Sequence, residues 1–126
     1  MSDRVVVLAQ DLIWSDRLDR LVGAVGAEAR RADTAGAFEA ALADARFAIV
    51  DLTARAYDPF EAIGRAAGLG VHVLAVGPHD DVDERKRALA RGADQVLAYR
   101  KLSEDGPATL QRWMARATTP AAATPR

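Results

Sequence analysis

The stretch of sequence that decides the fold is Phe47-Ala48-Ile49-Val50-Asp51-Leu52-Thr53. Four apolar residues in a row predict a strand buried on both faces, as in the parallel sheet of an α/β protein. The apolar run ends at a single carboxylate, Asp51. Because ligands of open α/β sheets gather at the carboxyl ends of the strands, Asp51 is the first candidate for a functional residue.

Strands and helices are predicted to alternate on both sides of this stretch. Leu18, Leu21, Val22 and Val25 have the spacing of a helix face, and Asp58-Pro59-Phe60-Glu61 has the N-cap, proline and acid that open a helix. Further helices are expected after Thr34, over 83–91 and from Asp105-Gly106-Pro107 onward, and further strands at 5–9, 27–32, 71–76 and 95–98.

Five strands that alternate with five helices predict an α/β fold with a parallel sheet. The expected form is a single doubly wound, flavodoxin-like (βα)5 domain with the strand order 2-1-3-4-5, over residues 1–117. The Thr-, Pro- and Ala-rich residues 118–126 are predicted to be a disordered tail. In this strand order, Asp11 after the first strand lies beside Asp51.

The composition excludes several classes of protein. The 126 residues contain no cysteine, so disulfides and thiolate metal sites are excluded, and the net charge of −1 gives no overall attraction to nucleic acid or membranes. No apolar run approaches the ~20 residues of a membrane span. We therefore expect a cytoplasmic protein with neither a nucleic-acid nor a membrane partner. No nucleophile–base pair is apparent, so an enzyme is not predicted.

Two groups of acidic residues are candidate metal sites. Asp11 and Asp51 could hold Mg²⁺, which takes one or two carboxylates together with water; alternatively, each acid caps the turn or helix that follows it. His79, Asp80, Asp81 and Asp83 form a second candidate cluster, although Asp81 or Asp83 is also needed to cap the next helix.

A basic cluster is predicted around the fourth helix and the last strand. It comprises Arg85, Lys86, Arg87, Arg91, Arg100 and Lys101. Such a cluster is either a solvated helix face or a docking surface for an acidic partner. Trp14 lies outside the main stripe of the first helix, so it is expected either near the Asp11 rim or in the interior.

The strand order, together with IVDL at 49–52 and ALARGADQVL at 88–97, resembles the receiver domain of bacterial response regulators over about residues 4–117. The resemblance implies that Asp51 is the position that accepts phosphate from a histidine kinase. It also implies that two acids after the first strand hold Mg²⁺. A Ser or Thr after the fourth strand and a Lys after the fifth strand would contact the phosphoryl group.

The sequence departs from this pattern at four positions. The acid pair is Gln10-Asp11, the hydroxyl position is Gly77, the lysine position is Tyr99, and the aromatic position of the last strand is Val96. Because phosphoryl transfer depends on positioning and charge neutralisation, these changes remove most of the required groups. Arg100 and Lys101 are the candidate replacements for the lysine, if a short loop turns one of them inward.

The leading hypothesis is an atypical receiver, or pseudo-receiver, that acts as a protein-interaction module in bacterial signalling, with phosphorylation lost or altered. Its partner is another signalling protein or a second copy, bound through Arg85, Arg87, Arg91 and Tyr99 on the fourth helix, fifth strand and fifth helix. One alternative is a working single-domain receiver that uses Asp51, Asp11 and Lys101. Another is a small-ligand or metal-binding protein that uses the rim formed by Asp11, Asp51 and His79.

Overall fold

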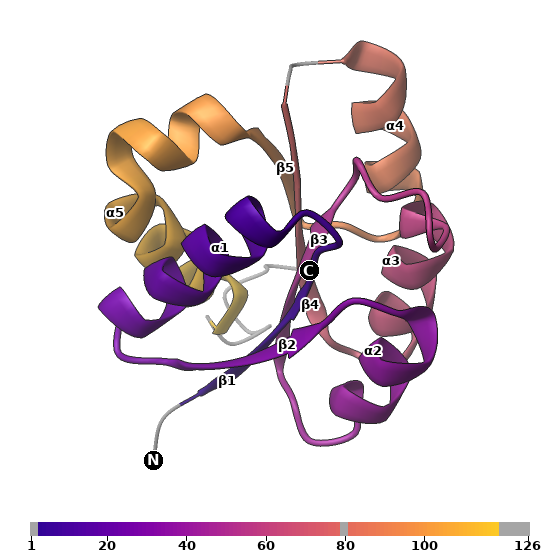
Figure 1. Ribbon diagram of the computed structural model, residues 1–126, viewed down its shortest axis with the longest axis horizontal. Coiled ribbons are helices and arrows are strands. Elements are labelled where there is room, and N and C mark those ends of the chain that lie inside the picture. Colours follow the sequence, from indigo (N-terminus) through magenta and orange to yellow (C-terminus); the bar gives the residue numbers. More distant parts are fainter. Residues whose placement is uncertain (1–2, 79–80, 119–126) are drawn as a thin grey trace, which may run out of the picture.

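The computed structural model describes residues 3–78 and 81–118. Its strands form one parallel sheet in the order β2-β1-β3-β4-β5, which confirms the predicted flavodoxin-like α/β fold (Figure 1). The strands are β1 (Arg4–Leu8), β2 (Glu28–Ala32), β3 (Phe47–Asp51), β4 (His72–Gly77) and β5 (Gln95–Ala98). The helices are α1 (Leu12–Ala24), α2 (Ala35–Leu42), α3 (Pro59–Gly68), α4 (Val82–Arg91) and α5 (Tyr99–Thr118).

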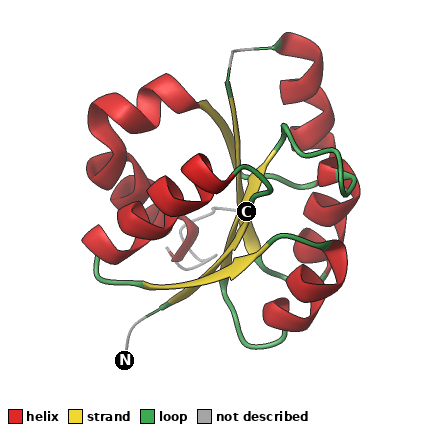
Figure 2. Ribbon diagram, in the orientation of Figure 1, coloured by secondary structure: helices red, strands yellow, loops and turns green. Residues whose placement is uncertain are grey.

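Helices cover both faces of the sheet. α1 and α5 lie side by side on one face, and α2, α3 and α4 cover the other (Figure 2). Each face has its own apolar core, one centred on Leu18, Phe47 and Trp113 and the other on Phe38, Val50 and Ile63. In the part of the chain that the model describes, no helix combines the length and the apolar character needed to cross a bilayer.

The central strands explain why Asp51 lies where it does. All five residues of β3 are buried, as the apolar run predicts. β3 pairs with β1, with Leu8 opposite Val50, so the two strands end at the same edge of the sheet. The residues that follow them, Gln10 and Asp11 after β1 and Thr53 after β3, therefore meet in one crevice above Asp51.

Local signals at the helix ends agree with the sequence. Thr34, Asp58 and Asp81 are N-caps whose side chains accept hydrogen bonds from backbone amides of α2, α3 and α4. Gly92 ends α4 with φ 117°, a left-handed conformation that favours glycine, and a Cβ there would lie 2.5 Å from the Cβ of Ala67. The close approach of α3 and α4 therefore requires glycine at this position.

The last helix differs from the prediction. α5 begins at Tyr99, directly after β5, and not at 105–107. Asp105 has φ −151° and ψ 43°, so 105–107 is a break inside α5 and not its start. Pro107 lacks the N–H that an uninterrupted helix would use, which accounts for the break. α5 extends to Thr118, and the rest of the predicted tail lies outside the described residues.

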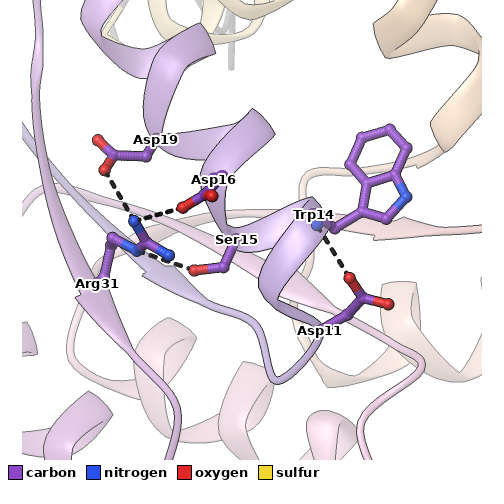
Figure 3. Close-up of polar contacts among 6 residues, drawn as sticks. All are labelled: Asp11, Trp14, Ser15, Asp16, Asp19 and Arg31. Carbon is purple, nitrogen blue, oxygen red and sulfur yellow. Dashed lines mark hydrogen bonds and ion pairs between the residues drawn. The ribbon is translucent and has the colours of Figure 1, made fainter.

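The polar edge strand β2 is fixed to α1 through Arg31. Its Nε donates to Oγ of Ser15 at 2.9 Å, and its Nη1 lies 2.8 Å from Asp16 and 3.4 Å from Asp19. Figure 3 shows these three side chains turned to the same side of α1. The arginine thus gives an otherwise polar strand a specific partner on the neighbouring helix.

Candidate functional site

Asp51 lies at the centre of the crevice and is fully buried. The hydroxyl of Tyr99 donates to the carboxylate and lies 2.7 Å from both Oδ1 and Oδ2. The backbone N–H and the hydroxyl of Thr53 donate to Oδ1, at 3.0 Å and 2.9 Å. Both carboxylate oxygens therefore have donors from the protein. The contacts with Thr53, two residues further along the chain, form a turn that the Asp51 side chain stabilises.

Tyr99 is held over Asp51 from two directions. The first turn of α5 carries its backbone, and its ring stacks on Trp14 of α1 with the centroids 3.8 Å apart and the planes 17° from parallel. Burial raises the pKa of the Tyr99 phenol above its ordinary value, and the hydrogen bond to Asp51 raises it further. The group that faces the carboxylate is therefore a neutral hydrogen-bond donor.

Tyr57 is a buried side chain that contacts the backbone at the ends of β1 and β3. Its hydroxyl donates to the carbonyl oxygen of Leu8 at 3.2 Å and lies 3.5 Å from that of Asp51, so it bridges the ends of β1 and β3. Burial raises the pKa of Tyr57, and the negative charges of Asp51 and Asp33 act in the same direction. This side chain was not identified as a site residue from the sequence.

Gln10 has a role that sequence reasoning also missed. Its Oε1 accepts hydrogen bonds from the backbone N–H groups of Arg55 and Ala56, at 2.8 Å and 3.1 Å. The residue at the first acid position of the receiver pattern therefore holds the loop between β3 and α3. The sequence offered one signal for this role, the glutamine itself at a position where the receiver pattern has an acid. The carbonyl oxygen of its side-chain amide can accept from two backbone donors without the charge that a carboxylate would add.

Asp11 is exposed and caps α1, where its Oδ1 accepts from the N–H of Trp14 at 3.0 Å (Figure 3). Asp11 lines a pocket of about 330 Å³ together with Gln10, Thr53 and Arg55. Arg55 supplies a cation to this pocket, a second feature that the sequence did not reveal.

Of the residues predicted to hold Mg²⁺, Asp51 directs both carboxylate oxygens at protein donors, and Asp11 is the exposed carboxylate, with Oδ1 accepting from the N–H of Trp14. Mg²⁺ needs free carboxylate oxygens in near-octahedral geometry. The oxygens of Asp51 accept from Tyr99 and Thr53, and Oε1 of Gln10 accepts from two amides. Over residues 3–78 and 81–118, no three His, Cys, Asp or Glu side chains converge on a common point.

Arg100 and Lys101 lie in a helix, whereas their candidate role requires a short loop that turns one of them toward Asp51. Both residues lie in the first turns of α5 and are exposed. The Arg100 side chain is 88% exposed and lies 3.8 Å from Glu104. Among the described residues, no basic side chain forms an ion pair with Asp51. The donor that replaces the expected lysine is Tyr99 itself.

The residues of the predicted partner face lie on two sides of the sheet, with Arg87 and Arg91 exposed on α4. The guanidinium of Arg87 lies 3.9 Å from the centre of the Phe60 ring, and Arg91 lies beside Gly64 of α3. Arg85 is half-buried, and Tyr99 is turned inward on the opposite side of the sheet. Arg87 and Arg91 thus lie beside α3 and are still exposed, so a partner surface on α4 stays a prediction.

The second candidate metal cluster is only partly described. Asp81 caps α4, where its Oδ1 accepts from the N–H of Glu84 at 3.0 Å. Asp83 lies exposed in the first turn of α4. His79 and Asp80 lie outside the described residues.

The sequence matches no protein-family model and no curated protein. Solved structures do match. A two-component response regulator from Clostridium difficile aligns with a TM-score of 0.82 and 11% identity, over 94% of this chain and 100% of that one. The protein has the fold of a response-regulator receiver domain. A CheY-like receiver domain protein from Methanospirillum hungatei JF-1 aligns with a TM-score of 0.73 and 20% identity, over 92% of this chain and 99% of that one.

A third receiver-fold match is a response regulator from Burkholderia pseudomallei, with a TM-score of 0.69 and 21% identity over 77% of this chain and 59% of that one. That structure contains a phosphorylated aspartic acid, a calcium ion and citrate. These identities are low, so the matches show that the chain shares the receiver fold and do not transfer the chemistry of those proteins to it.

Proposed function

We propose that this protein is a pseudo-receiver: a cytoplasmic protein-interaction module of bacterial signal transduction that works without phosphorylation of Asp51. The observation that carries the proposal is the pair of 2.7 Å contacts between the Tyr99 hydroxyl and the two oxygens of a fully buried Asp51. The receiver fold supports a role in signalling through contact with other proteins.

The chemistry of phosphoryl transfer supports the same conclusion. The attacking carboxylate oxygen must approach phosphorus in line, and metal ions and cations must neutralise the charge that develops. Here a phosphoryl group would have to displace Tyr99 from Asp51. The phenol of Tyr99 is neutral, Gly77 has no hydroxyl, and Gln10 holds a loop. The groups around Asp51 therefore stabilise an unmodified carboxylate.

Intact-mass spectrometry after incubation with acetyl phosphate and Mg²⁺ tests this proposal. We expect the mass of the unmodified chain for both the wild type and the Asp51→Asn variant. A stoichiometric phosphoryl adduct on the wild type that is absent from Asp51→Asn would instead establish the working receiver, with Arg55 as the cation that lines the pocket.

Titration calorimetry distinguishes the small-ligand alternative. The rim pocket is polar and open, and the side-chain oxygens of Asp51 and Gln10 already accept hydrogen bonds, which leaves Asp11 as the exposed carboxylate of the pocket. We therefore expect no saturable heat with Mg²⁺, Mn²⁺ or common nucleotides. A saturable isotherm that is lost in an Asp11→Asn variant would support a ligand-binding protein in place of an interaction module.

A further inference from the structure

A pocket lies at the edge of the sheet opposite the Asp51 crevice. His72 and Gln95 are the first residues of β4 and β5, whereas Asp51 is the last residue of β3, and the three strands are parallel. The volume of the pocket is about 340 Å³, at the small end of the range of about 300–1,000 Å³ for ligand sites. Its lining combines the starts of β4 and β5 with the last turns of α5, and consists of His72, Asp94, Gln95, Trp113, Arg116 and Ala117.

The carboxylate of Asp94 is held in this pocket by two neighbouring elements. Nε1 of Trp113 on α5 donates to its Oδ2 at 3.2 Å, and Nδ1 of His72 on β4 lies 3.5 Å from the same oxygen. The backbone N–H of Asp94 donates to the carbonyl oxygen of Val73 at 2.8 Å. Within the described part of the chain, Oδ1 accepts no hydrogen bond, and the side chain is 36% exposed. Asp94 therefore presents a fixed carboxylate with one oxygen open to a ligand.

Arg116 brings the opposite charge to the same pocket. It lies one turn after Trp113 on α5 and is exposed. Over residues 3–78 and 81–118, Arg116 forms no ion pair, whereas Arg112 of the same helix lies 3.5 Å from Asp105. The pocket thus contains a cation and an anion that the protein does not pair with each other.

We propose that this pocket binds a small zwitterion, with an ammonium group at Oδ1 of Asp94 and a carboxylate at the guanidinium of Arg116. Asp94 would repel a ligand with only negative charge, and Arg116 would repel one with only positive charge. Charge-assisted hydrogen bonds are roughly twice as strong as neutral ones, so these two residues determine the class of ligand. Free amino acids, amino acids with a longer charge separation and dipeptides all have this chemistry. The inference goes beyond the proposed interaction role and does not depend on it.

Two other classes of ligand fit the pocket less well. A metal ion would meet His72 and Asp94 without a third ligand, because no three His, Cys, Asp or Glu side chains of the described residues converge. A nucleobase would need an open aromatic face for stacking. Trp113 is 1% exposed, and its ring packs edge-on against Phe47. A compact ligand that carries both charges satisfies the pocket without either feature.

Titration of the ¹⁵N-labelled full chain with zwitterions of increasing charge separation tests the proposal. The probes are the standard amino acids, β-alanine, 4-aminobutyrate and glycylglycine. Binding is followed at the indole N–H of Trp113 and the backbone amide of Gln95, and we expect at least one probe to shift both signals saturably. Analogues of that probe that lack either the ammonium or the carboxylate should bind about tenfold more weakly.

Two variants and a matched control assign the binding to the two charges. Arg116→Gln and Asp94→Asn should each lose about tenfold in affinity. The Asn side chain can still accept from the indole of Trp113, so the packing of α5 is retained. Arg112→Gln makes the same change one turn earlier on α5, outside the pocket, and should leave affinity within about twofold.

Three results would overturn the proposal: no saturable shift with any probe, equal affinity for the singly charged analogues, or an equal loss in Arg112→Gln. Shifts concentrated at Gln10, Thr53 and Arg55 would also overturn it, because the ligand would then occupy the Asp51 crevice. The mass test of Asp51 is a separate readout, so the zwitterion site and the pseudo-receiver assignment stand or fall independently.

Discussion

Replacing Tyr99 by Phe isolates the contact on which the site depends. The substitution removes one hydroxyl and leaves the ring, so the stacking on Trp14 is retained. Thr53 still donates twice to Oδ1 of Asp51, but Oδ2 loses the donor that the described structure gives it. The variant therefore measures the stabilisation that the phenol provides to a buried carboxylate.

The expected cost follows from the charge of the acceptor. A hydrogen bond to a charged group contributes about 1.5–3 kcal/mol, whereas a neutral one contributes about 0.5–1.5 kcal/mol. We expect Tyr99→Phe to lower the free energy of unfolding by about 2 kcal/mol, which corresponds to a fall in Tm of about 8 °C for a domain of this size. Tyr57→Phe is the matched control, because its hydroxyl donates to the neutral carbonyl of Leu8, and it should cost about 1 kcal/mol.

Urea unfolding followed by circular dichroism measures both variants, and an unchanged m-value shows that the denatured state is the same. The same substitution in an Asp51→Asn background completes a double-mutant cycle. There Tyr99→Phe should cost about 1 kcal/mol less, since the acceptor is no longer charged. A cost no larger than that of Tyr57→Phe, or an equal cost in both backgrounds, would refute the view that Tyr99 holds a charged Asp51.

Three further predictions concern stability and loop order. Burial raises the pKa of both Tyr57 and Tyr99 above the ordinary value of about 10. The stability that they contribute is therefore complete below about pH 10, and above it the unfolding free energy should fall by up to about 1.4 kcal/mol per pH unit for each tyrosine, as urea titrations would measure. Gly92→Ala should lower the free energy of unfolding by about 1–3 kcal/mol, because Gly92 has a φ of 117°. Gly23→Ala should raise it by about 0.5–1 kcal/mol, because Gly23 lies in α1 with open space around it. Equal shifts of Tm in the two variants would contradict this. Gln10→Ala should speed hydrogen exchange at the two loop amides that it holds, and unchanged rates would show that the loop is ordered by other contacts.

The fold was predictable because its signals are local. The apolar run of β3 marks a strand buried on both faces, and Asp58 and Gly92 mark helix ends by the backbone conformations that they favour. The alternation of these elements then leaves few topologies to consider. The position of Asp51 at the end of the central strand follows from the same reasoning.

The contacts of the site were not predictable in the same way. Tyr99 begins α5 directly after β5 without a capping residue, while 105–107 has the composition of a helix start. The Tyr99 hydroxyl bonds a residue 48 positions away, and Gln10 bonds amides 45 and 46 positions away. Neither contact leaves a periodic pattern in the sequence, because each depends on which side chains the folded sheet edge brings together.

The contact between Tyr99 and Asp51 has a consequence for how such a protein could carry information. A two-state regulator binds its partner with an affinity reduced by the fraction of molecules in the competent state. A crevice held in one arrangement by Tyr99 would remove that reduction, because the competent state would then be the only one populated. Occupancy would then depend on how much of the protein and of its partner is present. Control would pass from chemical modification to synthesis, degradation and competition between partners.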